Sequence, residues 1–320
     1  SIPLRYNRVI MSSPQKSYRF ASVILILGIL AVSTAAIFIR YAQQGAPSLI
    51  IAAYRLALAS LILLPFSFQK AQRDVIALPA SGKLQALLAG VFLAVHFATW
   101  IVSLELTSVA SSVVLVTTTP LWVAIFSPLF LKEHMKKEVW WGLGLALGGG
   151  VVVAASQICV WEESRLICTS LSSFFQGKAL LGNLLALTGA WMAAGYLLVG
   201  RKIRPLMSLR SYTLVVYSTA AVVLIILAAL NGYSFTDYPL SVFGWFLLLA
   251  IIPQVIGHSS FNWALRYLPA TFVSLALLGE PVGATILAMI FLRETPLLNE
   301  VVGGGMILSG IYLASLANRE

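Results

Sequence analysis

Long apolar segments alternate with short polar ones from residue 20 to residue 317. Each segment has about the 20 residues that a helix needs to cross a hydrocarbon layer of about 30 Å. The segments are continuously apolar rather than alternating, which favours helices over the strands of a membrane barrel. We therefore expect an all-α membrane protein with ten transmembrane helices, at about residues 20–41, 48–68, 84–104, 108–131, 139–157, 179–200, 211–231, 242–263, 269–292 and 297–317.

The composition of the chain supports this interpretation. Of its 320 residues, 59% are hydrophobic and 10% are charged, and the mean hydropathy is +0.92. A soluble domain carries about 25% charged residues, so an ordinary soluble protein is excluded, as are disordered and fibrous chains. Ten spans would use about 210 residues and leave no room for a sizeable domain outside the membrane.

The positions of the basic residues predict an orientation. The net charge is +10, from 21 Lys and Arg against 11 Asp and Glu. If the N-terminus is cytoplasmic, 16 of the 21 basic residues fall on the cytoplasmic side and four on the other, with Arg55 inside a span. Cytoplasmic loops of membrane proteins carry an excess of Lys and Arg. The excess charge therefore indicates that both termini are cytoplasmic, rather than a nucleic-acid-binding surface.

A shift of 161 residues superimposes the two halves of the chain without a gap. Chance similarity between apolar helices is the alternative explanation, but shared prolines, glycines and charged pairs make it a poor one. Matching positions are Arg40 and Arg201, Leu104 and Leu265, Pro120 and Pro281, Lys132-Glu133 and Arg293-Glu294, Gly28 and Gly189, Gly142 and Gly303, Gly144 and Gly305, and Gly149 and Gly310.

The repeat divides the chain into four parts. We expect a cytoplasmic N-terminal tail at 1–19, a first five-helix repeat at 20–157, an extracytoplasmic loop at 158–178 and a second five-helix repeat at 179–317. Residues 1–10 belong to the tail unless the native start is Met11. Because five is odd, the second repeat enters the membrane from the opposite side, and such inverted repeats are typical of secondary transporters.

The loop at 158–178 holds both cysteines of the chain, Cys159 and Cys168. Two cysteines are too few for a disulfide framework. They form either one disulfide in an oxidising compartment or two unpaired thiols.

The stretch from Ile256 to Glu294 contains GHSSFNWALRYLPATFVSLALLGEPVGATILAMIFLRE. It resembles the second repeat of EamA-type transporters of the drug/metabolite transporter superfamily, and the first repeat resembles that family more weakly. The resemblance implies a central cavity built from the third, fourth, eighth and ninth helices, with help from the first and sixth. It also implies export of small metabolites and a location in a bacterial inner membrane.

Ionisable residues inside a membrane span are functional candidates because each is costly unless paired or hydrated. Glu280 lies near the middle of the ninth expected span and is the only acid deep inside a span, since Glu300 is at the start of the tenth. Pro281 removes a backbone N–H and so is expected to free the carbonyl of Leu277, while Gly279 allows close approach. Thr117, Thr118, Thr119 and Pro120 occupy the matching place in the fourth helix. Glu280 either binds an amine-bearing group, or carries a coupled proton, or only pairs with a polar neighbour.

Other polar and aromatic residues extend this candidate site. Gln254, His258 and Asn262 recur every fourth residue and share one face of the eighth helix. They line the cavity or make interhelical hydrogen bonds, the latter being favoured for Asn262. His96 and Trp100 in the third helix either face the cavity or serve packing and the outer aromatic belt, and depth favours the belt for Trp100.

Two further residues have open interpretations. Trp191 lies near the middle of the sixth helix, so with Tyr196 it is either core packing or an aromatic wall of the cavity. Arg55 lies about eight residues into the second helix. It either snorkels to the outer surface, the simpler interpretation, or faces the bundle, where it binds an anion or pairs with Glu280.

Several motifs are missing from the sequence. It has no phosphate-binding GxxxxGK[ST] loop, no HExxH and no Cys/His cluster, so neither a cofactor nor a metal is predicted. No second acid near the middle of a span supports an enzyme.

The sequence therefore predicts a secondary transporter that exports a small, polar or amphipathic, amino-acid-like metabolite by alternating access. The alternatives are a lipid-carrier translocase or scaffold subunit and a membrane enzyme. Proton coupling and a homodimer through peripheral helices are left open. The predicted substrate-binding residues are Arg55, His96, Thr117, Thr118, Thr119, Trp191, Gln254, His258, Asn262 and Glu280, with helix breaks at Pro120, Gly279 and Pro281.

Overall fold

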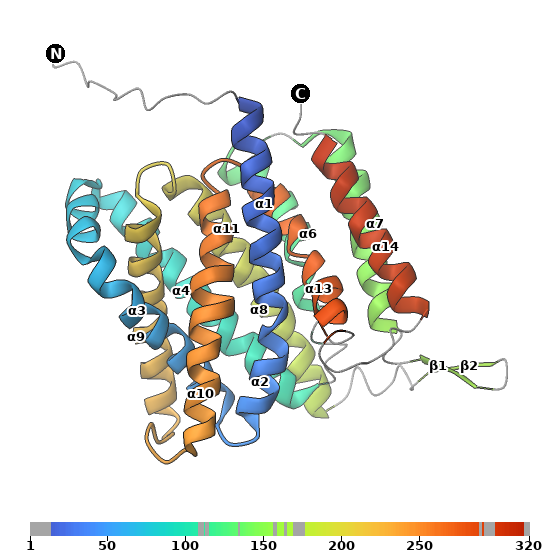
Figure 1. The fold of residues 1–320 in the computed structure, drawn as a ribbon, viewed down its shortest axis with the longest axis horizontal. Helices are drawn as coiled ribbons and strands as arrows, with labels where there is room; N and C mark the ends of the chain where they lie inside the picture. Colours follow the sequence, from blue (N-terminus) through green and yellow to red (C-terminus); the bar gives the residue numbers. More distant parts are fainter. Residues whose placement is uncertain are drawn as a thin grey trace.

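A computed structural model shows a helical bundle with one two-stranded hairpin beside it (Figure 1). It describes residues 14–107, 112, 115–133, 135–155, 159–162, 165–168, 177–287, 290 and 298–316. The helices are α1 (Pro14–Ser33), α2 (Ala35–Gln43), α3 (Ser48–Ala77), α4 (Ala80–Leu106), α6 (Thr119–Phe130), α7 (Lys137–Ala155), α8 (Gly177–Ile203), α9 (Leu209–Leu230), α10 (Leu240–Leu249), the π-helix η2 (Ala250–His258), α11 (Ser259–Ala264), α12 (Ala270–Ala276), α13 (Gly279–Leu287) and α14 (Leu298–Leu316).

Six helical segments within the described residues are long and apolar enough to cross a membrane. They are Phe20–Gln43, Ser48–Ala77, Ala80–Leu106, Gly177–Ile203, Leu209–Leu230 and Leu240–Ala264. Shorter apolar helices cover Thr119–Phe130 and Val301–Ala314. The chain is therefore a membrane protein with multiple apolar helices, and the count of ten spans stays a prediction.

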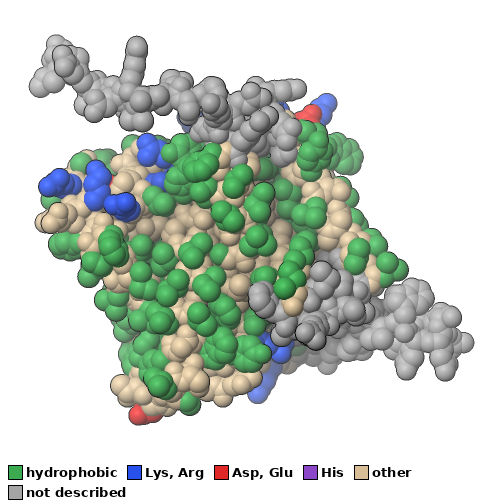
Figure 2. All heavy atoms as spheres, viewed as in Figure 1, with side chains coloured by type: hydrophobic (Ala, Val, Ile, Leu, Met, Phe, Trp, Pro, Cys, Tyr) green, Lys and Arg blue, Asp and Glu red, His purple; other side chains and the backbone are tan. Residues whose placement is uncertain are grey.

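Hydrophobic side chains cover most of the visible outer surface, and the coloured charged side chains gather at its ends (Figure 2). Such a surface suits a hydrocarbon environment, in which a charged side chain facing lipid is costly. Helix α3 continues past the expected end at residue 68 to Ala77 and carries Lys70 and Arg73 on its exposed extension. At 1.5 Å per residue its 30 residues span about 45 Å, more than the membrane core of about 30 Å.

The helix expected at 269–292 is interrupted before its proline. Helix α12 ends at Ala276 and α13 begins at Gly279. The carbonyl of Leu277, expected to be free, accepts a hydrogen bond from the backbone N–H of Glu280 at 2.9 Å, so that expectation was wrong. The helix is interrupted by a turn between Ala276 and Gly279, and this turn places the N–H of Glu280 within hydrogen-bond distance of the Leu277 carbonyl. A similar turn at Thr117 and Thr118 precedes α6.

The eighth expected span also departs from a regular helix. Residues Ala250–His258 form a π-helix that contains Pro253. Proline lacks the backbone N–H that would complete the α-helical pattern, and π segments are frequent at functional sites. Gln254 and His258, two of the predicted site residues, both lie in η2.

Contacts between helices repeat at the same shift of 161 residues. Gly28 of α1 lies against Ser260 and Phe261, and Gly189 of α8 lies against Thr99 and Trp100, which are the equivalent positions. Likewise, Gly142 of α7 faces Gly310 of α14, and Gly149 faces Gly303. Each of these two contacts therefore maps onto the other when the halves are exchanged. The glycines let the backbones of α7 and α14 approach closely.

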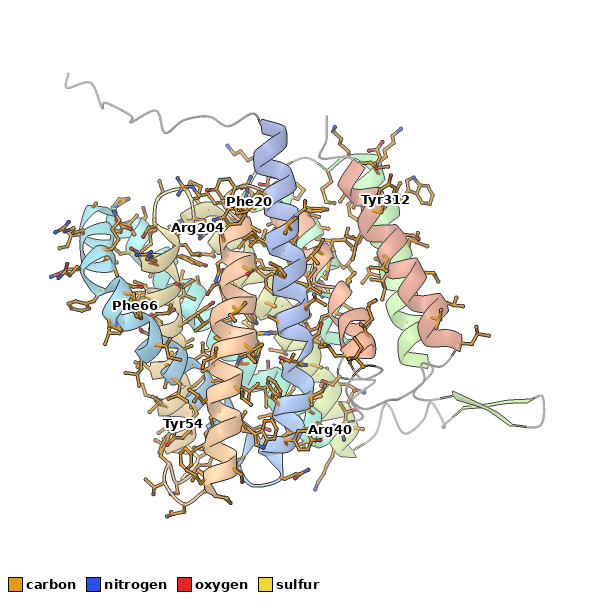
Figure 3. The ribbon with its side chains drawn as sticks, in the orientation of Figure 1. Phe20, Arg40, Tyr54, Phe66, Arg204 and Tyr312 are labelled. Carbon is orange, nitrogen blue, oxygen red and sulfur yellow. The ribbon has the colours of Figure 1, made fainter. Side chains whose placement is uncertain are left out.

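The two halves run in opposite directions through the bundle. Phe20 and Arg204 lie near one end and Arg40 near the other (Figure 3). Arg40 of α2 is equivalent to Arg201, which is in the last turn of α8 and three residues before Arg204. Equivalent helix ends therefore lie at opposite ends of the molecule.

The hairpin pairs strand β1 (Cys159–Glu162) with strand β2 (Arg165–Cys168) in antiparallel register. Cys159 and Cys168 are directly opposite each other in this register. The rest of the loop expected at 158–178 lies outside the described residues, except Gly177 and Lys178, which begin α8.

Candidate functional site

A cavity of about 90 Å³ lies inside the bundle. Its wall is formed by side chains from α1, α2, α3, α4, α6, α8, η2, α11, α12, α13 and the turns before α6 and α13. A single water needs about 10–15 Å³, so the cavity has room for several waters. It lies where a substrate would be enclosed, but it is too small in this conformation for a large solute.

The cavity wall follows the internal repeat. Residues of the wall that are equivalent at a shift of 161 are Val32 and Ala193, Ala35 and Tyr196, Phe97 and His258, Trp100 and Phe261, Val116 and Leu277, Thr117 and Leu278, and Thr119 and Glu280. The rings of Phe97 and His258 also contact each other, with centroids 5.3 Å apart. A contact between two equivalent residues lies on the axis that relates the halves, so the cavity surrounds that axis.

Arg55 of α3 faces the bundle interior and is 1% exposed. This rules out snorkelling, which the sequence had favoured, because the side chain is enclosed by neighbouring helices. Its Nε donates a hydrogen bond to Oε1 of Gln254 at 2.8 Å, and its guanidinium carbon lies 4.2 Å from the centre of the Phe97 ring. Its Nη1 is buried without a hydrogen-bond partner among the described residues.

Glu280 lines the same cavity from the first turn of α13. Its backbone carbonyl accepts a hydrogen bond from the Ser33 hydroxyl of α1 at 3.0 Å. That bond fixes the start of α13 against α1. Arg55 of α3 lines the same cavity. The cavity therefore holds a negative and a positive side chain from different repeats.

Two histidines, His96 and His258, line the cavity. Nδ1 of His96 lies 2.9 Å from the carbonyl oxygen of Gly189, which can only accept, so Nδ1 carries the proton. The ring of His96 stacks on Trp100 with centroids 5.9 Å apart. Nδ1 of His258 is buried without a partner among the described residues.

Trp100 is 8% exposed and lines the cavity, so its predicted place in the outer aromatic belt was wrong. The close packing of α4 on α8 turns this ring inward. Its indole N–H is also buried without a described partner. Arg55, Gln254 and His258 each have a buried polar atom of the same kind. The region of the cavity therefore has four polar groups without a described hydrogen-bond partner.

The threonines before α6 divide between two roles. Thr117 and Thr119 line the cavity, as does Pro120. Thr118 accepts a hydrogen bond from the indole N–H of Trp122 at 3.1 Å instead. In the other half, an added Cβ at Gly279 would lie 3.3 Å from the Ile29 side chain, so the close approach there is to helix α1.

Asn262 lies in a buried hydrogen-bond network rather than on the cavity wall. Its Oδ1 accepts a hydrogen bond from the Tyr196 hydroxyl at 2.5 Å, and its backbone carbonyl accepts one from Nε of Arg204 at 2.6 Å. Burial lowers the pKa of Arg204, which follows α8, to about 10, so it remains charged at neutral pH. Interhelical hydrogen bonding, the favoured interpretation of Asn262, agrees with this geometry.

Trp191 does not line the cavity. It is 43% exposed on the outer side of α8, where its ring meets Trp122 edge-on with centroids 5.3 Å apart. Core packing is therefore not its role either. Phe97 and Phe261 line the cavity but were missed, although Phe261 could have been found as the equivalent of Trp100.

An ion pair joins the last turn of α8 to the segment that follows α6. Nε of Arg201 lies 2.8 Å from Oε1 of Glu133, and its Nη1 donates to the carbonyl of Leu265 at 2.9 Å. Ser127 of α6 donates to the second oxygen of Glu133 at 3.2 Å. Within the repeated pair Lys132-Glu133, the acid thus has Arg201 as its partner. The counterpart at Arg293-Glu294 lies outside the described residues.

Comparison with known proteins identifies several relatives. The model of the EamA-like transporter family matches residues 19–155 and again residues 180–316. An uncharacterized transporter of Archaeoglobus fulgidus is 23% identical over 304 residues, which are 93% of this chain and 98% of that protein. The uncharacterized transporter YyaM of Bacillus subtilis is 26% identical over 223 residues, 68% of each chain.

A solved crystal structure is similar to this fold with a TM-score of 0.73 at 17% identity. The similarity covers 94% of this chain and 98% of the other. At this identity it supports the fold alone.

Proposed function

This chain belongs to the EamA-like transporter family, and from that premise we propose that it is a secondary transporter which exports a small, amino-acid-like metabolite. The substrate class is inferred from the polar groups around the cavity that have no described hydrogen-bond partner. Buried polar groups are normally satisfied, so groups left without a protein partner favour a polar ligand.

The types of these groups favour a zwitterion. Nη1 of Arg55 and the indole N–H of Trp100 are donors, which suits a carboxylate. Glu280 supplies the opposite charge on the same wall and suits an ammonium group. The rings of Phe97 and Phe261 offer apolar surface to the rest of the molecule.

The proposed mechanism is alternating access. Two similar halves that run in opposite directions can adopt two related states, each open to one side of the membrane. In this conformation the Arg201–Glu133 ion pair holds the ends of α6, α8 and α11 together. Opening at that end requires the ion pair to break while the opposite end closes.

The proposal includes the membrane arrangement predicted from the sequence. Ten spans form two inverted repeats, at 20–157 and 179–317, and the tail at 1–19 and the C-terminus face the cytoplasm. Under this arrangement the Arg201–Glu133 ion pair is at the cytoplasmic end, with the excess of basic residues.

The test is transport by purified protein in liposomes. A mixture of labelled amino acids and related metabolites is loaded, and the solutes that leave are identified with and without a pH gradient. For any solute transported by the wild type, we expect Arg55→Met to lower affinity about tenfold or more, since a hydrogen bond to a charged group is lost. The surface variant Arg210→Gln should match the wild type.

Glu280→Gln separates two roles of the carboxylate. If Glu280 carries a coupled proton, the variant transports without dependence on the pH gradient. If Glu280 only binds the ammonium group, the variant loses affinity for zwitterions and keeps the pH profile. Unchanged rate and pH profile would exclude both roles, and absence of flux for every solute would overturn the transport proposal.

The properties of the cavity are less typical of a lipid-carrier translocase. Such a protein needs a largely apolar path, whereas this cavity is lined by both Arg55 and Glu280. An enzyme would need a second catalytic group beside Glu280. The two histidines on the cavity wall, His96 and His258, are both packed against aromatic rings.

A further inference from the structure

A second hollow lies outside the cavity, on the outer side of the bundle. It runs along α8 between α4 and α6 and has a volume of about 550 Å³. Its wall includes Phe92, Trp122, Phe126, Trp191 and Val199, and Lys202 lies at one end. We call this hollow the lateral groove.

The lateral groove has the dimensions of one leaflet. Along α8 its wall extends from Trp191 to Lys202, eleven residues and therefore about 16 Å. Half of a hydrocarbon core is about 15 Å. The wall is almost entirely apolar, with aromatic rings on α4, α6 and α8. A single acyl chain lying along the helix would fill it.

The polar groups gather at one end of the groove. Lys202 is exposed there, and Gln85 of α4 lies beside it on the wall. Glu133 follows the groove residue Leu131 by two positions, but its carboxylate is paired with Arg201 at 2.8 Å. The end of the groove therefore presents a positive charge and an amide, and the acid close to it in sequence is neutralised.

We propose that the lateral groove binds one acyl chain of an anionic phospholipid, with the phosphate at Lys202. An apolar channel of leaflet length ending at a cation matches the two parts of such a lipid. Among membrane lipids, those with net negative charge gain from a Lys near the surface, whereas zwitterionic lipids gain little. This proposal does not rest on the identity of the transported solute.

A bound acyl chain would contact Trp122, which is hydrogen-bonded to the segment that lines the cavity. Trp122 forms part of the groove wall, and its indole N–H donates to the hydroxyl of Thr118. The residues on either side, Thr117 and Thr119, line the cavity. Lipid in the groove therefore contacts the segment that begins α6 and completes the cavity wall.

The proposal is tested by photocrosslinking in nanodiscs. The probe is a phosphatidylglycerol with a diazirine in one acyl chain, compared with the matched phosphatidylcholine, each as a minor component. Labelled residues are mapped by mass spectrometry of peptides. We expect phosphatidylglycerol to label the groove faces of α6 and α8 about fivefold more than phosphatidylcholine does.

Two variants and two controls distinguish binding of the acyl chain from binding of the lipid headgroup. Val199→Trp fills the groove and should reduce labelling there by either lipid, whereas Leu184→Trp, at a 53% exposed position of α8 outside the groove, should not. Lys202→Gln should abolish the preference for phosphatidylglycerol and keep the labelled positions. Arg210→Gln, an exposed charge at the same end, should keep the preference.

Size-exclusion profiles confirm that each variant is folded, and Lys202→Gln remains decisive if Val199→Trp is not. Even labelling of all lipid-facing helices, equal labelling by both lipids, or a preference that survives Lys202→Gln would overturn the proposal. Any of these results would leave the liposome transport assay unaffected.

Discussion

At the scale of residues, Arg55 is held in the bundle by contacts that satisfy only part of its guanidinium. Nε donates a hydrogen bond to Gln254, and the face of the guanidinium packs on the Phe97 ring. Nη1 has no described partner. A buried cation in a membrane protein is costly, which is why such residues are retained mainly at functional positions. The contact with Gln254 should therefore matter for stability as well as for binding.

We predict that Gln254→Met, which keeps the volume but removes the acceptor, lowers the free energy of unfolding by about 2 kcal/mol. The loss follows because Nε of Arg55 would be left buried without its partner. Denaturant unfolding in detergent measures it. The double variant Arg55→Met with Gln254→Met should regain part of the loss, since no unpaired cation remains. Additive losses would show that the two side chains act independently.

The sequence predicted some of these residues because polar groups near the middle of apolar helices stand out. Glu280, His96 and Thr119 were found in that way, and each lines the cavity. The direction in which the Arg55 side chain points could not be predicted from the sequence of its own helix. Eight residues into a span, its long side chain can reach either the surface or the interior, and the choice depends on Phe97 and Gln254 on other helices.

At the scale of elements, the Arg201–Glu133 ion pair joins the last turn of α8 to the segments that follow α6 and α11. Both side chains are only about one quarter exposed, at 24% and 23%. An ion pair shielded in this way is screened less by salt than a surface pair. It is therefore a candidate for holding one end of the bundle closed.

We predict that Glu133→Gln increases access to the cavity from that end. A cysteine introduced by Ala193→Cys, with Cys159 and Cys168 replaced by serine, would report it through reaction with a water-soluble maleimide. Labelling should be several-fold faster than with Glu133 intact, and Arg201→Gln should act in the same direction. Arg210→Gln serves as the matched loss of charge. Equal labelling in all variants would show that the ion pair does not limit access.

Local irregularities were the least predictable elements. The π-helix at Ala250–His258 includes a proline, but proline alone also permits an ordinary kink, so the sequence does not distinguish the two. A break was expected at Gly279 and Pro281, and the structure has it directly before them, between Ala276 and Gly279. The turn forms through hydrogen bonds to Ser274, Leu275 and Leu277 carbonyls.

At the scale of the whole molecule, the repeat was the strongest prediction from sequence. Prolines, glycines and charged pairs at one shift indicated two related halves, and the family model matches each half separately. The structure adds that the contacts repeat as well, as at Gly28 and Gly189. What the sequence could not reveal is which repeated positions meet at the axis, since that depends on how the halves pack together.

We predict that the C-terminus and the loop at 158–178 lie on opposite sides of the membrane, as ten spans with a cytoplasmic N-terminus require. Alkaline phosphatase is active only outside the cytoplasm. Fused after residue 320 it should be inactive, and inserted at residue 170 it should be active. Green fluorescent protein at the same two positions should give the reverse pattern. The same result at both positions would contradict an odd number of spans between the loop and the C-terminus.

The place of the cavity on the axis has a consequence for how the protein could have arisen. If two identical half-length chains associated around that axis, every wall residue would appear twice, and the site would suit only a ligand with two equal ends. Joining the halves into one polypeptide lets Glu280 differ from its equivalent Thr119, and lets Arg55 differ from its equivalent Val216. Covalent linkage of the repeats thus permits a site that distinguishes the two ends of an asymmetric molecule.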